Sequence, residues 1–254
     1  MPSCVPDATM TRSGTSIRFL FLGTSTSVGV PVIGCRCPVC TSTHPNDDRS
    51  RASALLSGPW GNLLIDTGPD LHQQALRENL TKVDGVLYTH SHLDHVTGFD
   101  ELRAFCWHRQ DPLPLYGSPE TLAALKRMFP WAFASGQSQP GYVRPDPREV
   151  TSPFHFENLK ITPVEVLHGQ VHTFGFRFDH PALGSLAYLP DVKIIPPSSL
   201  DLLRDLDILI IDALRHEEHK THMTVDEALD TIDRLQPRRS YLTHLSHELP
   251  WEET

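Results

Sequence analysis

Short apolar stretches recur along the chain, and glycine, proline and polar turn residues separate them. Stretches of this length, rich in leucine, isoleucine and valine, are typical of β-strands buried in a sheet. They predict strands over residues 17–22, 52–57, 62–65, 85–89, 114–117, 161–167, 185–190, 207–211 and 240–243. The sequence Gly-Pro-Trp-Gly that follows the second of these predicts a hairpin-like turn.

The segments between these strands predict helices over residues 70–79, 98–105, 119–128, 197–204 and 224–235. Asp70 is the expected N-cap of the first helix, and Thr224 with Glu227 forms a capping box at the start of the last. Residues 130–153 are rich in proline, glycine, serine and glutamine without a clear period, and they predict an irregular loop or lid.

The length of 254 residues is sufficient for one sizeable hydrophobic core. Residues 1–16 are polar and predict a flexible N-terminal tail, so the expected organisation is a single domain over residues 17–254. No apolar stretch approaches the roughly 20 residues that span a bilayer, and the tail lacks the apolar segment of a secretory signal. The sequence therefore predicts a protein without a membrane span.

A dense run of ligand-type side chains, His90-Ser91-His92-Leu93-Asp94-His95, follows the strand predicted at 85–89. Strand ends are places where scaffolds commonly present functional groups. Imidazole and carboxylate ligands suit zinc, iron, manganese or cobalt. Four such ligands so close together are too many for one closed site, but they can face two metal ions about 3.5–4 Å apart.

Four later predicted strands also end at a histidine or an aspartate: His168, Asp191, Asp212 and His244. One histidine after a strand is usually an ordinary surface residue. The repetition of this pattern beside the His90–His95 run makes these residues candidates for the same site.

A second cluster, Cys35-Arg36-Cys37-Pro38-Val39-Cys40, presents three thiols at zinc-ligand spacing. Tetrahedral zinc needs a fourth ligand, for which His44 is a nearby candidate and His247 a distant one. Clustered cysteines fit a metal site in a reducing compartment better than a disulfide framework, so the cytoplasm is the expected location.

The formal net charge of −9 argues against an extended nucleic-acid surface, which requires a basic field. A small anionic substrate remains compatible with this charge, because metal ions can supply local positive charge. The glycine- and hydroxyl-rich stretch 23–31 could approach a phosphate through its backbone N–H groups, or it is an ordinary loop.

The pattern His90-x-His92-x-Asp94-His95 resembles the signature of the metallo-β-lactamase superfamily, and the resemblance extends from about residue 17 to about residue 247. It implies an α/β fold, a four-layer αβ/βα sandwich of two mixed β-sheets flanked by helices. It also implies that His90, His92 and His168 hold one metal, that Asp94, His95 and His244 hold a second, and that Asp191 bridges the two. An aspartate at the position of Asp66 supports the ligand loop in that family without binding metal.

A narrower resemblance rests on the three cysteines, on His244-x-x-His247, on residues 23–31 and on Thr221-His222. These features are similar to the PhnP-type phosphodiesterases of the carbon–phosphorus lyase pathway. The resemblance implies a structural zinc on Cys35, Cys37, Cys40 and His247, beside two catalytic divalent ions, manganese or zinc. The implied reaction is hydrolysis of a small cyclic or nucleoside-type phosphodiester by a metal-bridging hydroxide, with Asp191 at the catalytic centre. His222 is the expected general acid, and His219 and His216 are the alternatives.

Three other interpretations compete with this one. A ribonuclease Z-like tRNA endonuclease would need a basic docking arm, which the sequence lacks. A protein like those of coenzyme PQQ biosynthesis would share the cysteine cluster. A zinc-binding nucleic-acid module is the alternative of a different class. We expect a small-molecule phosphodiester partner, no membrane and no extended nucleic-acid contact; the oligomeric state is left open, with a homodimer as one option.

Overall fold

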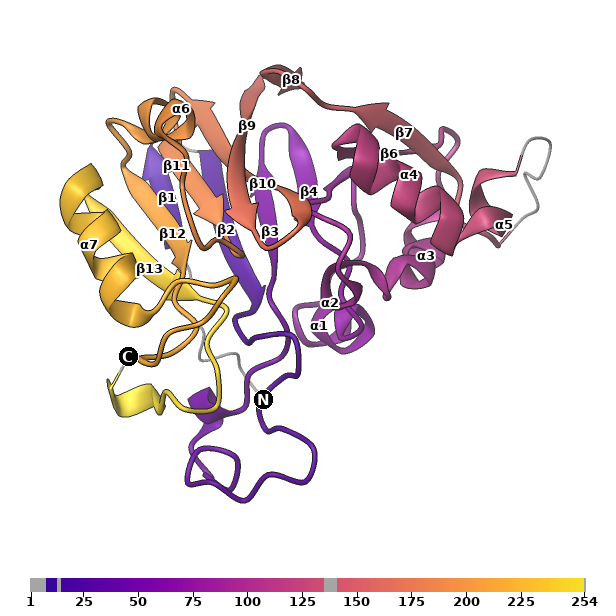
Figure 1. Cartoon of the computed structure of the whole chain (residues 1–254). Helices are drawn as coiled ribbons and strands as arrows, with labels where there is room; N and C mark the ends of the chain where they lie inside the picture. Colours follow the sequence, from indigo (N-terminus) through magenta and orange to yellow (C-terminus); the bar gives the residue numbers. More distant parts are fainter. Residues whose placement is uncertain (1–7, 13–14, 135–140, 254) are drawn as a thin grey trace.

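Two mixed β-sheets packed face to face form the centre of the protein, with helices on the outer side of each sheet (Figure 1). The computed structural model describes residues 8–12, 15–134 and 141–253. This arrangement confirms the sandwich that the sequence predicts. No helix in these ranges has both the length and the apolarity that a bilayer crossing requires.

The first sheet has seven strands in chain order. They are β1 (Ala8–Arg12), β2 (Thr15–Gly23), β3 (Ser53–Gly58), β4 (Gly61–Ile65), β5 (Gly85–Leu87), β6 (Leu113–Gly117) and β7 (Pro145–Glu149). Neighbours from β1 to β4 pair antiparallel, and neighbours from β4 to β7 pair parallel. The carboxyl ends of β4 and β5, where Asp66 and the His90–His95 run begin, therefore lie at one edge of the sheet.

The second sheet has six strands in the order β13-β12-β11-β10-β9-β8. They are β8 (Phe154–Phe156), β9 (Leu159–His168), β10 (Val171–His180), β11 (Gly184–Leu189), β12 (Ile208–Asp212) and β13 (Arg239–Thr243). The strands β11, β12 and β13 are parallel, and the others pair antiparallel. The sequence did not predict β8 and β10, because polar residues interrupt their apolar positions.

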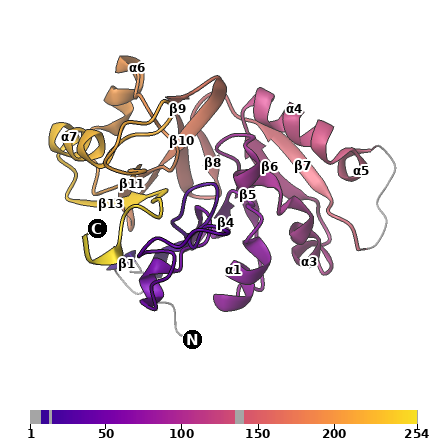
Figure 2. The same cartoon turned by 60° about the horizontal axis from the view of Figure 1, so that its bottom comes forward.

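Helices cover the outer face of each sheet, as Figure 2 also shows. Against the first sheet lie α1 (Leu71–Arg77), α2 (Leu93–Val96), α3 (Leu102–Cys106), α4 (Pro119–Met128) and α5 (Pro130–Phe133). Against the second lie α6 (Pro197–Leu200) and α7 (Val225–Leu235). Short 3₁₀ turns occur at Pro45–Asp47, Phe99–Glu101, Asp201–Leu203 and Trp251–Glu253. The predicted capping box is present at the start of α7.

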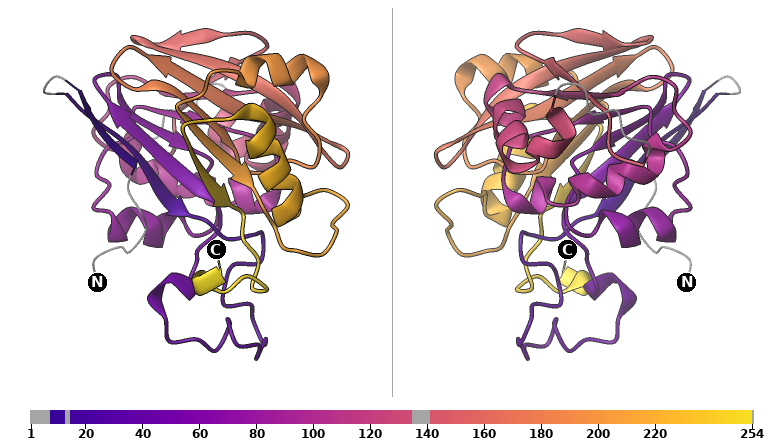
Figure 3. Two further views of the ribbon diagram at one scale, coloured as in Figure 1. Left: turned by 90° about the vertical axis from the view of Figure 1, so that its left-hand side faces the viewer. Right: turned by 90° about the vertical axis from the view of Figure 1, so that its right-hand side faces the viewer.

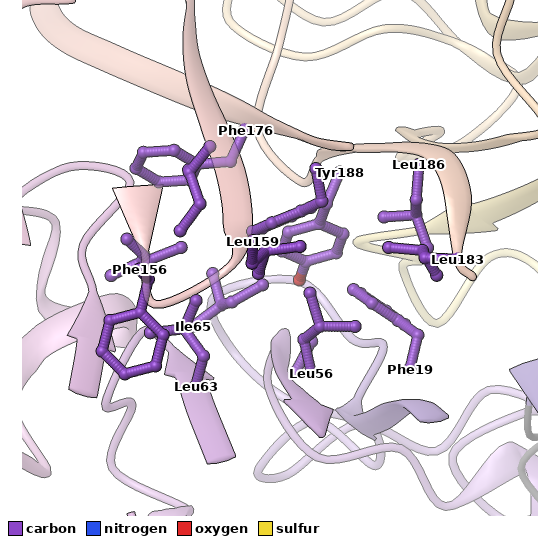
Figure 4. Packing of buried hydrophobic residues seen from close by; sticks show 14 of the residues in the cluster. Phe19, Leu56, Leu63, Ile65, Phe156, Leu159, Phe176, Leu183, Leu186 and Tyr188 are labelled. Carbon is purple, nitrogen blue, oxygen red and sulfur yellow. The ribbon is translucent and has the colours of Figure 1, made fainter. Parts of the chain in front are cut away.

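Alternation along the strands explains the layers, because successive side chains point to opposite faces. In β4, Leu63 and Ile65 enter the core between the sheets, whereas Leu64 packs under the helices of the first sheet. In β12, Ile208 and Ile210 face the inter-sheet core, and Leu209 packs toward α6 and α7. Figure 4 shows the inter-sheet core, in which Leu56 and Phe19 of one sheet meet Tyr188 of the other.

Two sequence predictions about irregular segments are wrong. The predicted tail contains β1 and the start of β2, and the two pair from Ala8 with Phe19 to Arg12 with Thr15. The predicted lid over 130–153 contains α5 and β7, the edge strand of the first sheet. Edge strands tolerate polar residues and proline, so the sequence Pro-Asp-Pro-Arg-Glu gave no strand signal. Residues 1–7, 13–14, 135–140 and 254 lie outside the described ranges.

Asp70 stands at the predicted N-cap position of α1, where its backbone carbonyl accepts the N–H of Gln74. Asp70 precedes α1, but its side chain makes no capping hydrogen bond. Its carboxylate accepts hydrogen bonds from the backbone N–H and the guanidinium of Arg51 instead. Because the Asp70 carboxylate pairs with Arg51, it is not available to cap the helix.

Candidate metal centre

The ligand-type residues converge where strands of the two sheets end. His168 ends β9, and Asp191 and His244 follow closely after β11 and β13. The backbone N–H of Phe174 in β10 donates to the carbonyl of Thr89, which directly precedes His90. This hydrogen bond joins the ligand loop of the first sheet to the second sheet, so residues far apart in the sequence share one site.

Three histidines form the first ligand set. The Nε2 atom of His90 lies 2.9 Å from Nδ1 of His92, and Nε2 of His168 lies 3.2 Å from the same atom. Nitrogens bound to one tetrahedral zinc at about 2.0–2.1 Å would be roughly 3.3 Å apart. The arrangement therefore fits one metal ion held by all three rings.

Asp94, His95 and His244 form the second set, and Asp191 lies between the two sets. Nε2 of His95 is 3.2 Å from Asp94 Oδ2, and Nε2 of His244 is 3.8 Å from that oxygen. Asp191 places Oδ1 3.2 Å from His95 Nε2. Its Oδ2 lies 3.3 Å from His244 Nε2 and 3.6 Å from His168 Nε2. One carboxylate thus reaches both sets, as a bridging ligand must.

The buried nitrogen and oxygen atoms of the site are also arranged as metal ligands would be. His95 Nε2, His244 Nε2 and Asp191 Oδ1 are buried, and none of them has a hydrogen-bond partner within the described residues. Buried polar atoms are normally hydrogen-bonded. These imidazole nitrogens lie 3.2–3.3 Å from the oxygens of Asp191 without a regular hydrogen bond, as ligands of a shared metal ion would. A set of imidazole and carboxylate donors fits zinc, manganese or iron. The residues present therefore fit two divalent ions, and their role as ligands stays a prediction.

Asp66 supports this ligand set from behind. It is fully buried, its Oδ1 accepts the backbone N–H of Thr89 at 2.8 Å, and its Oδ2 lies 2.8 Å from Nδ1 of His95. Burial disfavours a charge on His95, but Asp191, Asp66 and Asp94 outweigh it and raise the pKa of this imidazole well above its usual value. The carboxylates thus favour positive charge among them, which is what a divalent cation supplies.

His222 lies against both ligand sets. Its ring stacks on that of His244 at 4.5 Å between centroids and meets that of His168 edge-on at the same distance. Its Nδ1 is 2.7 Å from Oδ2 of Asp212, a fully buried carboxylate at the end of β12. Burial, with His244 adding to it, lowers the pKa of His222 to about 4. The negative charges of Asp191 and Asp94 oppose this shift and favour the charged form of the ring.

The loop that carries His222 is fixed to the ligand loops. The backbone N–H of Met223 donates to the carbonyl of Val192, whose own N–H donates to Asp212 Oδ2. Nδ1 of His168 lies 2.8 Å from the carbonyl oxygen of Thr221. These bonds couple the position of His222 to His168, a member of the first ligand set, and to the loop that carries Asp191.

The two alternative histidines are placed less favourably for proton donation. The His219 ring is 5.2 Å from that of His222, and its Nδ1 lies near Thr221 at 3.3 Å. His216 is exposed and lines a groove beside the cysteine cluster instead. Of the three, the geometry favours His222.

The cysteine cluster closes on His247. Nδ1 of His247 lies 3.4, 3.4 and 3.5 Å from the sulfurs of Cys35, Cys37 and Cys40. Zinc bonds of about 2.3 Å to sulfur and 2.0–2.1 Å to nitrogen place tetrahedral ligands roughly 3.5 Å apart. His44 instead caps a 3₁₀ turn, where its Nδ1 accepts the N–H of Asn46. The structure therefore brings the distant histidine, not the nearby one, to the thiols.

Comparison with known proteins places the chain in a family. Residues 61–245 match the model of the beta-lactamase superfamily domain. The chain belongs to this superfamily. The matched range contains both candidate ligand sets and His222, whereas the cysteine cluster and His247 lie outside it.

Among solved structures, this superfamily member is similar to a protein described as a new diphosphatase from the PhnP family. The two share 39% identity with a TM-score of 0.85, over 94% of this chain and 89% of the other. Zn²⁺-bound PqqB from Methylobacterium extorquens has 21% identity and a TM-score of 0.73 over 91% of this chain and 90% of the other, and it supports the fold alone.

Two curated relatives carry different names. A protein named octanoyltransferase from Porphyromonas gingivalis is 36% identical over 92% of this chain and 47% of its own length. A ribonuclease Z from a Bradyrhizobium species is 27% identical over 64% of this chain and 50% of its own length. The chain spans about half the length of these relatives. More than half of the octanoyltransferase lies outside the match, so its name need not describe the matched part.

Sequence reasoning missed two features of the site. It did not pair Asp212 with His222, because the two are brought together only by the way that the 213–224 loop folds back. It also did not identify Arg49, a buried arginine beside the cysteine cluster. The sequence around a single arginine in a polar loop does not indicate that its side chain is buried.

Proposed function

We propose that this protein is a metal-dependent hydrolase that cleaves a small phosphodiester. The observation that carries the proposal is the His222–Asp212 pair, 2.7 Å apart, held against two merged sets of metal-ligand side chains. A proton donor beside a two-metal centre suits a reaction in which an alkoxide leaves from phosphorus.

Each group of residues at the site has a separate role in this proposal. His90, His92 and His168 would hold one divalent ion, Asp94, His95 and His244 a second, and Asp191 would join both. When bound, the two ions supply a nucleophile near neutral pH and offset negative charge on the phosphoryl oxygens. Asp66 keeps the His95 ring in a fixed orientation, which limits the ways in which the site can rearrange.

His222 provides the proton for the leaving group. Its Nδ1 faces Asp212, so its Nε2 is the atom that is free to donate. Asp212 favours the imidazolium form, and so does the negative charge of a bound diester. After the bond from phosphorus to the leaving oxygen breaks, the proton moves from Nε2 to that oxygen.

A second candidate substrate is a diphosphate, in which a phosphate is the leaving group. The observation that favours it is the likeness to the PhnP-family diphosphatase over 94% of the chain. A phosphate leaves more readily than an alkoxide, so this reaction depends less on His222. Octanoyl transfer and tRNA cleavage rest on relatives that this chain covers only by about half, and the net charge of −9 further disfavours tRNA.

Turnover assays of the purified protein test the proposal. Protein loaded with manganese or zinc should hydrolyse bis(p-nitrophenyl) phosphate and a cyclic or nucleoside phosphodiester, and it should leave precursor tRNA intact. Hydrolysis of a diphosphate ester, but not of alkyl phosphodiesters, would favour the second candidate. Absence of all phosphoryl hydrolysis by protein with a filled two-metal centre would overturn the proposal.

A further inference from the structure

Arg49 is a buried cation between the cysteine loop and the C-terminal turn. Only 5% of its surface is exposed. In Figure 3 the two segments that it joins, one near the N-terminus and one near the C-terminus, lie side by side below the sheets. A buried arginine is rare and is normally paired, so its role needs an explanation.

The Arg49 guanidinium holds the turn that carries His247. Its Nη2 donates to the carbonyl oxygens of Ser246 at 3.1 Å and of Leu249 at 2.7 Å. These two residues bracket His247, whose Nδ1 is nearly equidistant from three sulfurs. The side chain of Arg49 therefore fixes the backbone on both sides of the proposed fourth zinc ligand.

The same turn carries His244, a proposed ligand of the catalytic centre. His244 has a φ of 60°, in the left-handed region, which costs a non-glycine residue free energy and persists only when its surroundings enforce it. Around it, Leu245 donates its N–H to the carbonyl of Thr24, and Ser246 donates to that of Leu214. The bond from Arg49 to the Ser246 carbonyl adds a third restraint within two residues of His244.

Charge gives a second reason for a cation at this position. Burial lowers the pKa of Arg49, while Asp47 and Cys40 raise it by their negative charge. Three thiolates and a neutral imidazole around a divalent zinc ion would leave one net negative charge. The Nε and Nη1 groups of Arg49 have no hydrogen-bond acceptor within the described residues, so nearby negative charge is what offsets their burial.

We propose that Arg49 is a positioning residue that clamps the 244–249 turn and balances the charge of the thiolate site, so that one side chain sets the geometry of both metal centres. This inference rests on the proposed zinc site. It goes beyond the proposed hydrolysis, because it assigns a role to a residue that contacts neither substrate nor metal.

Cobalt titration of the metal-free full-length protein tests the proposal. Thiolate-bound Co²⁺ has a charge-transfer absorption that histidine and carboxylate sites lack, so it reports on the cysteine site alone. Arg49→Met should weaken cobalt binding at this site by about tenfold or more, because a charged group's hydrogen bonds are lost. Arg49→Lys, which keeps the charge on a shorter side chain, should lose less.

Arg36→Met is the matched control. Arg36 lies between Cys35 and Cys37 but is exposed, so this change removes the same charge from the same loop without removing the clamp. Its cobalt affinity should stay within about threefold of the wild-type value, since exposed charges interact weakly. Amide hydrogen exchange of residues 245–249, measured with zinc saturating, should be faster in Arg49→Met and unchanged in Arg36→Met.

The outcomes separate the two proposals. Wild-type affinity and exchange in folded Arg49→Met would overturn the positioning role. If Arg49→Met does not fold by circular dichroism, Arg49→Lys decides: weaker cobalt binding than in Arg36→Met supports the clamp, and wild-type binding overturns it. If the wild-type protein shows no thiolate-bound cobalt, the zinc site and the role of Arg49 both fail. The proposed phosphodiester hydrolysis is tested separately by the turnover assays and does not fail with that result.

Discussion

The His222–Asp212 pair is the feature at the residue scale on which the proposed chemistry depends. His222 is 8% exposed and contacts the rings of two metal-ligand candidates, His168 and His244. Such a position suits proton donation, and it would equally suit a metal ligand, because ligand-type atoms of His168, Asp191 and His222 lie within 4.8 Å of one another. Mutation separates a donor from a ligand.

Replacing His222 by alanine should lower kcat for diesters with poor leaving groups by about 10²–10⁴-fold. The loss should be much smaller for p-nitrophenyl diesters, whose leaving group needs little protonation. Both catalytic metals should remain bound. His219→Ala is the control and should change kcat little. Equal losses for good and poor leaving groups, or loss of a metal, would count against the donor role.

Asp212→Asn should reproduce the leaving-group dependence of His222→Ala at smaller magnitude, because it removes the carboxylate that favours the imidazolium. Residues that act as a unit are not additive. The double variant should therefore be no slower than His222→Ala alone. A double variant whose loss equals the product of the two single losses would show that Asp212 acts independently of His222.

Gly68 shows how closely the ligand loops pack. A Cβ atom at this position would lie 2.3 Å from the backbone carbonyl oxygen of Asp94. Gly68→Ala should therefore displace the Asp94–His95 loop, cost about 1–3 kcal/mol of folding free energy, and reduce bound metal. Gly117→Ala is the matched control, since its Cβ would meet Tyr88 and Leu122 at ordinary contact distances of 3.5–3.6 Å. Denaturant unfolding and elemental analysis measure both effects, and equal stability of the two variants would contradict the prediction.

At the scale of elements, the cysteine site joins a loop near the N-terminus to the turn after β13. Zinc binding across so long a span supplies folding free energy and restricts the unfolded chain. The site also lies within three residues of His244 in the sequence, so it holds that ligand loop from outside the reaction centre.

Cys37→Ser should lose the thiolate-bound zinc and lower stability by about 2 kcal/mol or more, which is roughly 4–8 °C in Tm for a chain of this size. Activity should fall indirectly. His247→Ala should likewise lose the zinc and lower Tm. His44→Ala should change Tm and zinc content little, because His44 caps a turn. Calorimetry and zinc analysis test this. A large effect of His44→Ala with none of His247→Ala would show that the cluster closes locally.

At the scale of the whole molecule, loops at one end of the two packed sheets bring together the candidate ligands of three metal sites, from Cys35 to His247. Elemental analysis should find three metals per protein, two in the catalytic centre and one on the thiols. A chelator should remove the catalytic pair first and abolish turnover, because a catalytic metal keeps an open coordination position whereas a zinc ion with four protein ligands does not. Manganese or zinc should restore turnover. Protein that holds fewer than two metals after metal-saturating preparation would contradict the two-metal centre.

Local sequence patterns were sufficient to predict the type of the fold and to propose most of the candidate ligand set. Strand periodicity is a local property, and His90, His92, Asp94 and His95 lie within one short loop, so their spacing alone limits what they can bind. The same holds for the three cysteines. The residues that follow strand ends, His168, Asp191 and His244, could be proposed because parallel strands bring their carboxyl ends to one edge.

The three-dimensional structure was needed to choose between alternatives of the same residue type that differ only in spatial position. It selected His247 over His44 at the thiols, oriented His222 toward Asp212, and buried Arg49 between two segments from opposite ends of the chain. It also added β1 beside β2 and β7 beside β6 at the two edges of the first sheet, where polar residues and proline are tolerated. The physical reason is the same in each case: these contacts depend on loop paths and edge positions, which local sequence periodicity does not encode.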